Sequence, residues 1–135
     1  MIHNKVLVYI HIPKTAGTYL RTGWLLRNVS KYFWTDEKKD HRTISDLQSS
    51  SEEASCYGLI GGHEEIGEFL KIETFQPKII LSVLRDPIDR ILSFYNHIKN
   101  KDKNHPYHQM AQHSTLFELL MKEGKFYNKI KDEQI

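Results

Sequence analysis

The chain has little of three features that mark specialised classes of protein. Its single cysteine, Cys56, excludes an internal disulfide and a cysteine-rich zinc site. Its 19 basic and 17 acidic residues give a formal charge of +2, too small for the bulk field to attract nucleic acid or a membrane surface. Its first apolar run, residues 6–12, is far shorter than the ~20 residues that span a bilayer. Any recognition of an anion must therefore be local.

Length and composition are those of an ordinary globular protein. A chain of 135 residues with 39% hydrophobic and 27% charged residues predicts one domain, 1–135, with a single core. No N-terminal signal or membrane anchor is visible in the sequence, so we expect a cytoplasmic protein. Cys56 lies in an apolar run, which predicts a place in the core, and it is compatible with a reducing compartment.

The first apolar run leads into a short segment that suits an anion. Residues 6–12 are mostly β-branched or aromatic and predict a buried strand, which Pro13 ends. Apolar spacing typical of a helix follows, from about residue 18 to residue 29. Backbone N–H groups at a helix N-terminus attract anions, Lys14 adds a full charge, and Gly17 permits close approach. This segment predicts a phosphate or sulfate site, although a solvated lysine in a plain turn is an alternative.

The segment lacks a glycine that a loop binding a nucleoside triphosphate would need. The Walker A pattern requires a glycine ahead of its Gly-Lys pair, and residues 8–13 contain none. The segment His11-Ile-Pro-Lys-Thr-Ala-Gly-Thr18 instead resembles the 5′-phosphosulfate loop of sulfotransferases that use 3′-phosphoadenosine 5′-phosphosulfate (PAPS), in its carbohydrate-modifying form. The resemblance implies a catalytic Lys14 that stabilises transition-state charge. It also implies PAPS contacts from Lys14, Thr15, Ala16, Gly17, Thr18 and Tyr19.

A polar stretch separates this segment from the second apolar run. Residues 31–55 carry clusters of charge and serine with little apolar punctuation, which predicts a solvated surface linker with one short helix. An acceptor-binding surface is the weaker alternative.

The second apolar run, residues 56–60, is followed by two glycines and a histidine. The glycines let the backbone turn sharply and leave His63 exposed at the edge of the sheet. Histidine titrates near neutral pH and can accept the proton of an attacking hydroxyl. The Gly-His segment resembles that of uronosyl 2-O-sulfotransferases, which implies that His63 is the catalytic base. Glu64 and Glu65 are weaker candidates, and an ordinary surface histidine is the alternative.

The third apolar run, residues 78–84, is rich in branched residues and predicts a central parallel strand. Asp86 suits a helix N-cap, and Pro87 suits the first helical position, where its missing N–H costs nothing. An apolar stripe at helical spacing follows, formed by Ile88, Ile91, Leu92 and Tyr95.

Two polar residues flank the start of this helix. Arg85 ends the strand, and Ser93 lies eight positions on, an arrangement that resembles the 3′-phosphate-binding motif of the same sulfotransferases. The resemblance implies that Arg85 and Ser93 hold the 3′-phosphate of PAPS, and a guanidinium can make two parallel bonds to phosphate. Arg90 would support the loop or pair with a nearby aspartate. A capping ion pair between Arg85 and Asp86 is the alternative.

The C-terminal part carries no second chemical motif. The histidines at 105, 108 and 113 match no standard zinc spacing, so we expect a surface loop and no metal. Thr115 and Glu118 form a capping box, which predicts a helix through Lys122 that Gly124 closes.

Together these patterns predict an α/β, three-layer, P-loop-like domain with a short parallel sheet of about three strands flanked by helices. The implied function is sulfuryl transfer from PAPS to a hydroxyl of a carbohydrate or other acceptor. Sulfotransferase domains extend further, so we expect a C-terminally shortened chain, open to completion by another chain or a second copy. A non-catalytic module that binds PAPS or its desulfated product, and a P-loop kinase-like nucleotide-binding protein, stay as alternatives.

Overall fold

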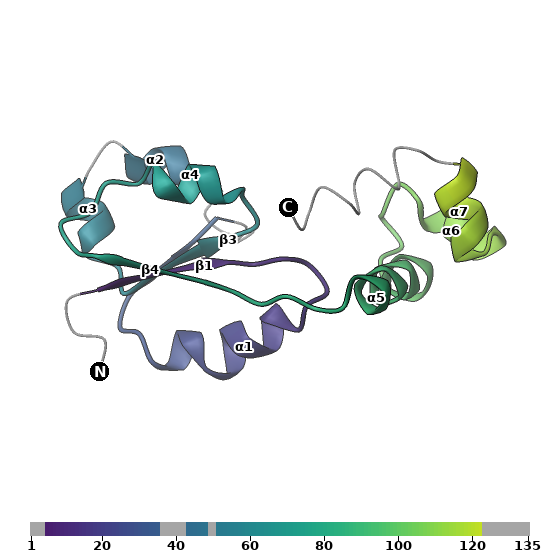
Figure 1. Ribbon diagram of the computed structural model, residues 1–135, viewed down its shortest axis with the longest axis horizontal. Helices are drawn as coiled ribbons and strands as arrows, with labels where there is room; N and C mark the ends of the chain where they lie inside the picture. The colour runs from purple at the N-terminus through teal and green to yellow at the C-terminus, as the bar shows by residue number, and fades with distance from the viewer. Residues whose placement is uncertain (1–4, 36–42, 49–50, 123–135) are drawn as a thin grey trace. The chain divides into compact units, whose positions relative to one another are not determined.

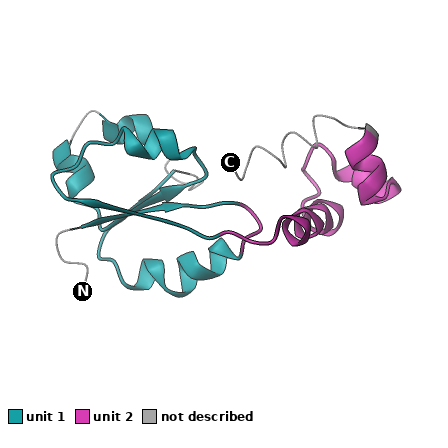
Figure 2. Ribbon diagram, viewed as in Figure 1, with its two compact units in different colours: residues 1–12, 16–83 teal, residues 13–15, 84–135 magenta. Residues whose placement is uncertain are grey.

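The computed structural model describes residues 5–35, 43–48 and 51–122, which divide into two compact units (Figure 2). The first unit comprises residues 1–12 and 16–83, and the second comprises residues 13–15 and 84–135. The short loop 13–15 therefore belongs to the second unit, although the chain on either side of it belongs to the first. That both units form one domain stays a prediction.

The first unit is built on a parallel sheet. Its strands in the described chain are β1 (Val6–Ile10), β2 (Tyr32–Trp34), β3 (Leu59–Gly62) and β4 (Lys78–Ser82). All neighbours pair in parallel, in the order β2-β3-β1-β4. The α/β class is confirmed, with four strands rather than about three.

Helices cover both faces of this sheet, which gives the predicted three layers (Figure 1). The helix α1 (Gly17–Gly23) and the 3-10 helix η1 (Leu25–Arg27) cover one face, and α2 (Ile44–Gln48), α3 (Ser51–Ser55) and α4 (Ile66–Leu70) cover the other. Successive residues of β1 enter the two cores in turn: Val6 and Val8 pack on one side, Leu7 and Tyr9 on the other. A parallel strand buried on both faces is apolar throughout, as the sequence indicated.

The prediction of a solvated linker over residues 31–55 is wrong. This stretch contains β2, whose Phe33 and Trp34 are buried, and α2 and α3, which add buried apolar side chains to the core. A strand of three residues is too short for its alternation to stand out among charged and serine-rich neighbours.

Two expected elements begin or end elsewhere. The helix expected over 18–29 ends at Gly23, and the backbone leaves helical geometry at Trp24 (φ −131°) before η1 begins. Glycine weakens a helix, which accounts for the early end. β3 starts at Leu59, so Cys56 precedes it and is exposed rather than in the core.

The third apolar run forms β4 at the edge of the sheet, not in its centre. Its Ile79 and Ile80 are 37% and 41% exposed. Continuous apolar composition is typical of a strand buried on both faces, but it does not specify the strand's place in the sheet.

The two glycines before His63 do not make a turn. Gly61 and Gly62 lie within β3, and no glycine of the described chain has a positive φ. A Cβ at Gly61 would lie 2.8 Å from one carbon of the Trp34 ring and 3.0 Å from the Tyr9 carbonyl oxygen. The glycine therefore permits β2 and β1 to pack closely against β3.

Gly61→Ala is expected to lower the free energy of unfolding by about 1–3 kcal/mol, because the added methyl overpacks the sheet. The matched control is Gly67→Ala in α4, where a Cβ meets nothing within 4 Å. That variant should be neutral or more stable, because alanine favours a helix. Urea unfolding measures both, and equal effects would contradict the close packing.

The second unit contains three helices in the described chain: α5 (Pro87–Asn100), α6 (His108–His113) and α7 (Leu116–Lys122). The cap of α5 is confirmed, since the Asp86 carboxylate accepts from the N–H groups of Ile88 and Asp89 at 3.0 and 3.1 Å, with Pro87 at the start. The core of this unit consists of Phe94, Tyr95, Ile98, Ala111 and Leu119.

The predicted apolar stripe of α5 is wrong in part. Ile88 and Leu92 are 69% and 43% exposed, whereas Phe94 and Ile98 join Tyr95 in the core. Arg90, which is not part of the predicted stripe, is 1% exposed. The helix therefore buries this charged side chain beside its apolar residues Phe94, Tyr95 and Ile98.

The C-terminal helices follow the sequence in one respect and depart from it in another. The capping box is confirmed, because the N–H of Thr115 donates to Glu118 at 2.7 Å and the N–H of Glu118 donates to the Thr115 hydroxyl at 3.3 Å. The surface loop expected around the histidines is wrong in part: His105 lies in the turn before α6, but His108 begins α6 and its Nδ1 lies 2.7 Å from the Ile98 carbonyl oxygen. Gly124 lies outside the described residues.

Candidate functional site

The loop between β1 and α1 has an unusual backbone. Lys14 and Ala16 have φ values of 68° and 65°, and they are the non-glycine residues with positive φ in the described chain. Left-handed geometry costs a residue with a Cβ roughly 1–2 kcal/mol. Such strain is concentrated at binding and catalytic sites, and here it shapes the loop that carries the lysine.

The first turn of α1 lies in the first unit. Its Gly17 is buried, and a Cβ there would clash with the His11 ring and the Tyr9 hydroxyl, so packing alone requires glycine. Ala16, Thr18 and Tyr19 are exposed, while Thr15 of the second unit is buried. That these residues contact PAPS stays a prediction.

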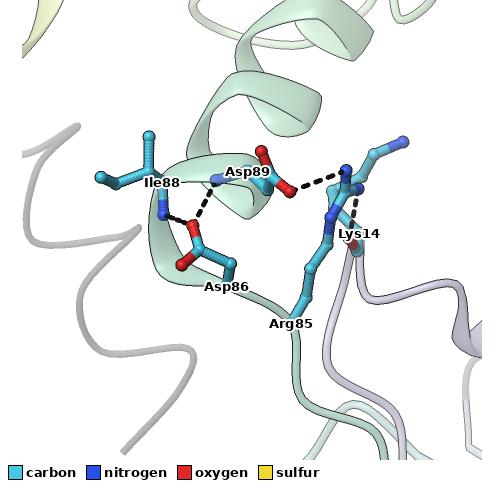
Figure 3. A network of polar contacts seen from close by, with 5 residues as sticks. All are labelled: Lys14, Arg85, Asp86, Ile88 and Asp89. Carbon is cyan, nitrogen blue, oxygen red and sulfur yellow. Dashed lines mark hydrogen bonds and ion pairs between the residues drawn. The ribbon is translucent and has the colours of Figure 1, made fainter.

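Arg85 follows β4 and begins the approach to α5 in the second unit. Its Nη1 donates to the Lys14 carbonyl oxygen at 3.3 Å, and its Nη2 lies 4.0 Å from Asp89 Oδ2. Figure 3 shows the guanidinium between these two oxygens. The carboxylate of Asp86 instead caps the helix. The alternative of an ion pair between Arg85 and Asp86 is therefore wrong, because the nearby carboxylate is that of Asp89.

Lys14, Arg85 and Ser93 line one cavity of about 430 Å³ within the second unit. Binding sites for small ligands generally fall in this size range. Its other lining residues come from α5 and its C-terminal end: Asp89, Leu92, Asn96, His97, Asn100 and Lys101. The structure thus brings together the basic residues of the two sequence motifs.

Positive charge is crowded in this cavity. Burial lowers the pKa of Lys14, and the nearby charges of Lys101 and Arg85 lower it further. Burial and the charges of Lys14 and Lys101 lower the pKa of His97, while Asp102 opposes them. Neighbouring cations disfavour one another's charged forms, and an anionic ligand would relieve that repulsion. The cavity is suited to a polyanion.

His63 lies in the first unit, directly after β3, and is exposed. Its ring centroid is 4.4 Å from that of His11, which in turn packs against Tyr9 and Trp34. Glu64 accepts a hydrogen bond from the Thr35 hydroxyl at 2.6 Å, so this weaker candidate for the base already has a partner. The role of His63 stays a prediction.

Sequence reasoning missed several residues of the cavity. Asn96, His97, Asn100 and Lys101 follow Ser93 at three, four, seven and eight positions, the spacing of one helical face. This spacing from Ser93 is the sequence signal that could have identified them. No group of three histidine, cysteine or acidic residues in the described ranges is arranged to hold a metal ion.

The comparisons with known proteins give one result. No curated protein and no solved structure matches the chain significantly. None of the helices in the described part is long and apolar enough to cross a membrane. A family model described as Sulfotransferase family matches residues 1–133, nearly the whole sequence. The match and the parallel α/β sheet agree, and the chain belongs to the sulfotransferase family.

Proposed function

We propose that this chain transfers the sulfuryl group of PAPS to a hydroxyl group of a carbohydrate. Membership of the family supports sulfotransfer in general. The observation that carries the specific proposal is the cavity of the second unit, which Lys14, Arg85 and Ser93 line together. A donor with a 5′-phosphosulfate and a 3′-phosphate needs basic groups of this kind.

The residues of the cavity fit such a donor. Lys14, Arg85 and Lys101 provide three positive charges, and His97 can provide a fourth, against the lining carboxylate of Asp89. Serine and asparagine side chains between them can donate hydrogen bonds to phosphate oxygens. Charge and hydrogen-bonding capacity both favour a nucleotide with more than one anionic group.

Each residue has a distinct task in this reaction. PAPS, when bound, supplies a sulfuryl group joined to a phosphate oxygen. Lys14 would stabilise the negative charge that develops on that oxygen as its bond to sulfur breaks. Arg85 and Ser93 would hold the 3′-phosphate and so fix the position of the donor. His63 would accept the proton of the acceptor hydroxyl as its oxygen bonds to sulfur.

The acceptor class rests on the sequence. The Gly-His segment and the form of the Lys14 loop resemble the uronosyl 2-O branch, which favours a uronic-acid-containing carbohydrate. A cytoplasmic location and completion by a second chain or copy stay predictions.

Arg85→Ala is expected to weaken the binding of adenosine 3′,5′-bisphosphate, the desulfated donor, by about 10- to 100-fold. A charge-assisted bond to phosphate is worth roughly 1.5–3 kcal/mol, and arginine can make two such bonds. Calorimetric titration without metal measures the affinity. The matched control is Arg27→Ala, which removes an exposed arginine of the first unit and should leave binding unchanged.

Three results would contradict the proposal in different ways. No binding by the folded wild-type chain would contradict use of this donor. Equal effects of the two arginine variants would contradict the role of Arg85. Magnesium-dependent binding of adenosine triphosphate in preference to the bisphosphate would support the kinase-like alternative.

A further inference from the structure

Two basic residues near the C-terminal end of α5 belong to neither sequence motif. His97 lies four positions after Ser93 and Lys101 lies eight positions after it, and all three line the same cavity. Eight residues of helix span about 12 Å. The polar and basic lining that α5 gives to the cavity therefore extends over more than two turns of the helix.

Lys101 is held by the geometry of the helix end. Its N–H donates to the His97 carbonyl oxygen at 2.8 Å, in the last turn of α5. This bond ties the C-cap residue to the turn that carries His97. Both side chains therefore enter the cavity from a defined part of the helix rather than from a separate loop.

Charge links these two residues to Lys14. Of the charges that lower the pKa of Lys14, Lys101 contributes more than Arg85 does. In the described part of the chain, neither Lys14 nor Lys101 forms an ion pair. Lys14, Lys101 and His97 thus make a cationic cluster without a neutralising carboxylate in contact with either lysine.

The dipole of α5 favours basic residues at its C-terminal end, but it does not determine which of them line the cavity. Basic residues in the last turn of a helix are favourable in general. Lys99 fulfils that role too, but its ammonium donates to the Tyr95 hydroxyl at 3.0 Å and it does not line the cavity. Lys101 and His97 instead share the cavity with Lys14.

We propose that Lys101 and His97 bind the 5′ anionic group of the nucleotide donor together with Lys14, while Arg85 and Ser93 bind its 3′-phosphate. This inference rests on the proposed function, because it assigns both ends of the cavity to one donor. It adds two residues to the donor site and gives the two lysines, which have no ion pair within the described ranges, an anionic partner.

The test compares two ligands that differ only in the 5′-phosphate. The affinity of adenosine 3′,5′-bisphosphate divided by that of adenosine 3′-monophosphate gives the factor by which the 5′-phosphate strengthens binding. Lys101→Gln is expected to reduce this factor by about 5- to 20-fold, the low end for a bond to a charged group because Lys101 is exposed. Arg85→Ala should weaken both ligands and leave the factor nearly unchanged.

The His97→Asn variant gives the same comparison a second readout. Because a bound anion favours the imidazolium, His97 contributes more as the pH falls through its pKa, which burial and the charges of Lys14 and Lys101 hold below the usual value. The other charged residues of this cavity and helix end are Asp89, Arg85, Lys101 and Asp102. The factor for the wild-type chain should therefore exceed that for His97→Asn at pH 5.5 and approach it at pH 8. Comparing the variants at each pH cancels the titration of the ligand.

Lys103→Gln is the matched control, since Lys103 is exposed, lies two residues beyond Lys101 and does not line the cavity. Equal factors for Lys101→Gln and Lys103→Gln, with binding still dependent on Arg85, would overturn this inference and leave the proposed function intact. Absence of binding by the wild-type chain would overturn both.

Discussion

Lys14→Ala is expected to lower turnover at saturating donor on the order of 100-fold or more, by analogy with the loss of one positioned charge-stabilising group. The ammonium of Lys14 would meet the oxygen on which charge develops as the sulfuryl group leaves. Burial and the nearby cations lower the pKa of Lys14, so a negative charge beside the ammonium would stabilise its charged form. The loss should therefore fall mainly on kcat.

Alanine is the right replacement because Lys14 has a φ of 68°. An alanine there has the same backbone strain as the lysine, so the change tests the side chain alone. Glycine would also relax the loop, and would mix the two effects. Lys103→Ala removes an exposed lysine from the same unit and serves as the control. An unchanged kcat in Lys14→Ala would exclude its catalytic role.

His63→Ala is expected to lower kcat by about 10²- to 10⁴-fold, the usual contribution of a general base. Donor affinity should stay close to that of the wild-type chain, because His63 does not line the cavity. Steady-state rates and calorimetric titration of adenosine 3′,5′-bisphosphate separate the two quantities.

His113→Ala is the control for this variant, since His113 is also exposed but follows no strand of the sheet. It should keep full activity. A large loss of donor affinity in His63→Ala, with kcat preserved, would mean that the histidine binds the donor and is not the base that deprotonates the acceptor.

The parts of the molecule that sequence predicts well depend on local chemistry. The Asp86-Pro87 start of α5 and the Thr115 capping box bring their own hydrogen-bonding partners within three residues, so short-range spacing identifies them. The strands ahead of Lys14 and Arg85 are confirmed because their apolar, branched residues stand out in the sequence, whereas the anion-binding roles of the two residues stay predictions.

The parts that sequence misses depend on long-range packing. β2 is three residues long, and what marks it as a strand is its pairing with β3, more than 20 residues further along the chain. The glycine of β3 at position 61 is required by the ring of Trp34, which is distant in sequence. His97 and Lys101 line the cavity because they lie on the same face of the helix as Ser93. Neither residue belongs to one of the two sequence motifs.

The most direct test of sulfuryl transfer uses the 135-residue chain, PAPS labelled with ³⁵S and a desulfated uronic-acid polysaccharide, without added metal. We expect label in the polysaccharide, one molecule of adenosine 3′,5′-bisphosphate released for each sulfate transferred, and almost no transfer by Lys14→Ala. If the chain binds the bisphosphate but transfers no label to the polysaccharide or to simpler hydroxylated acceptors, it is a donor-binding module and not the enzyme proposed here.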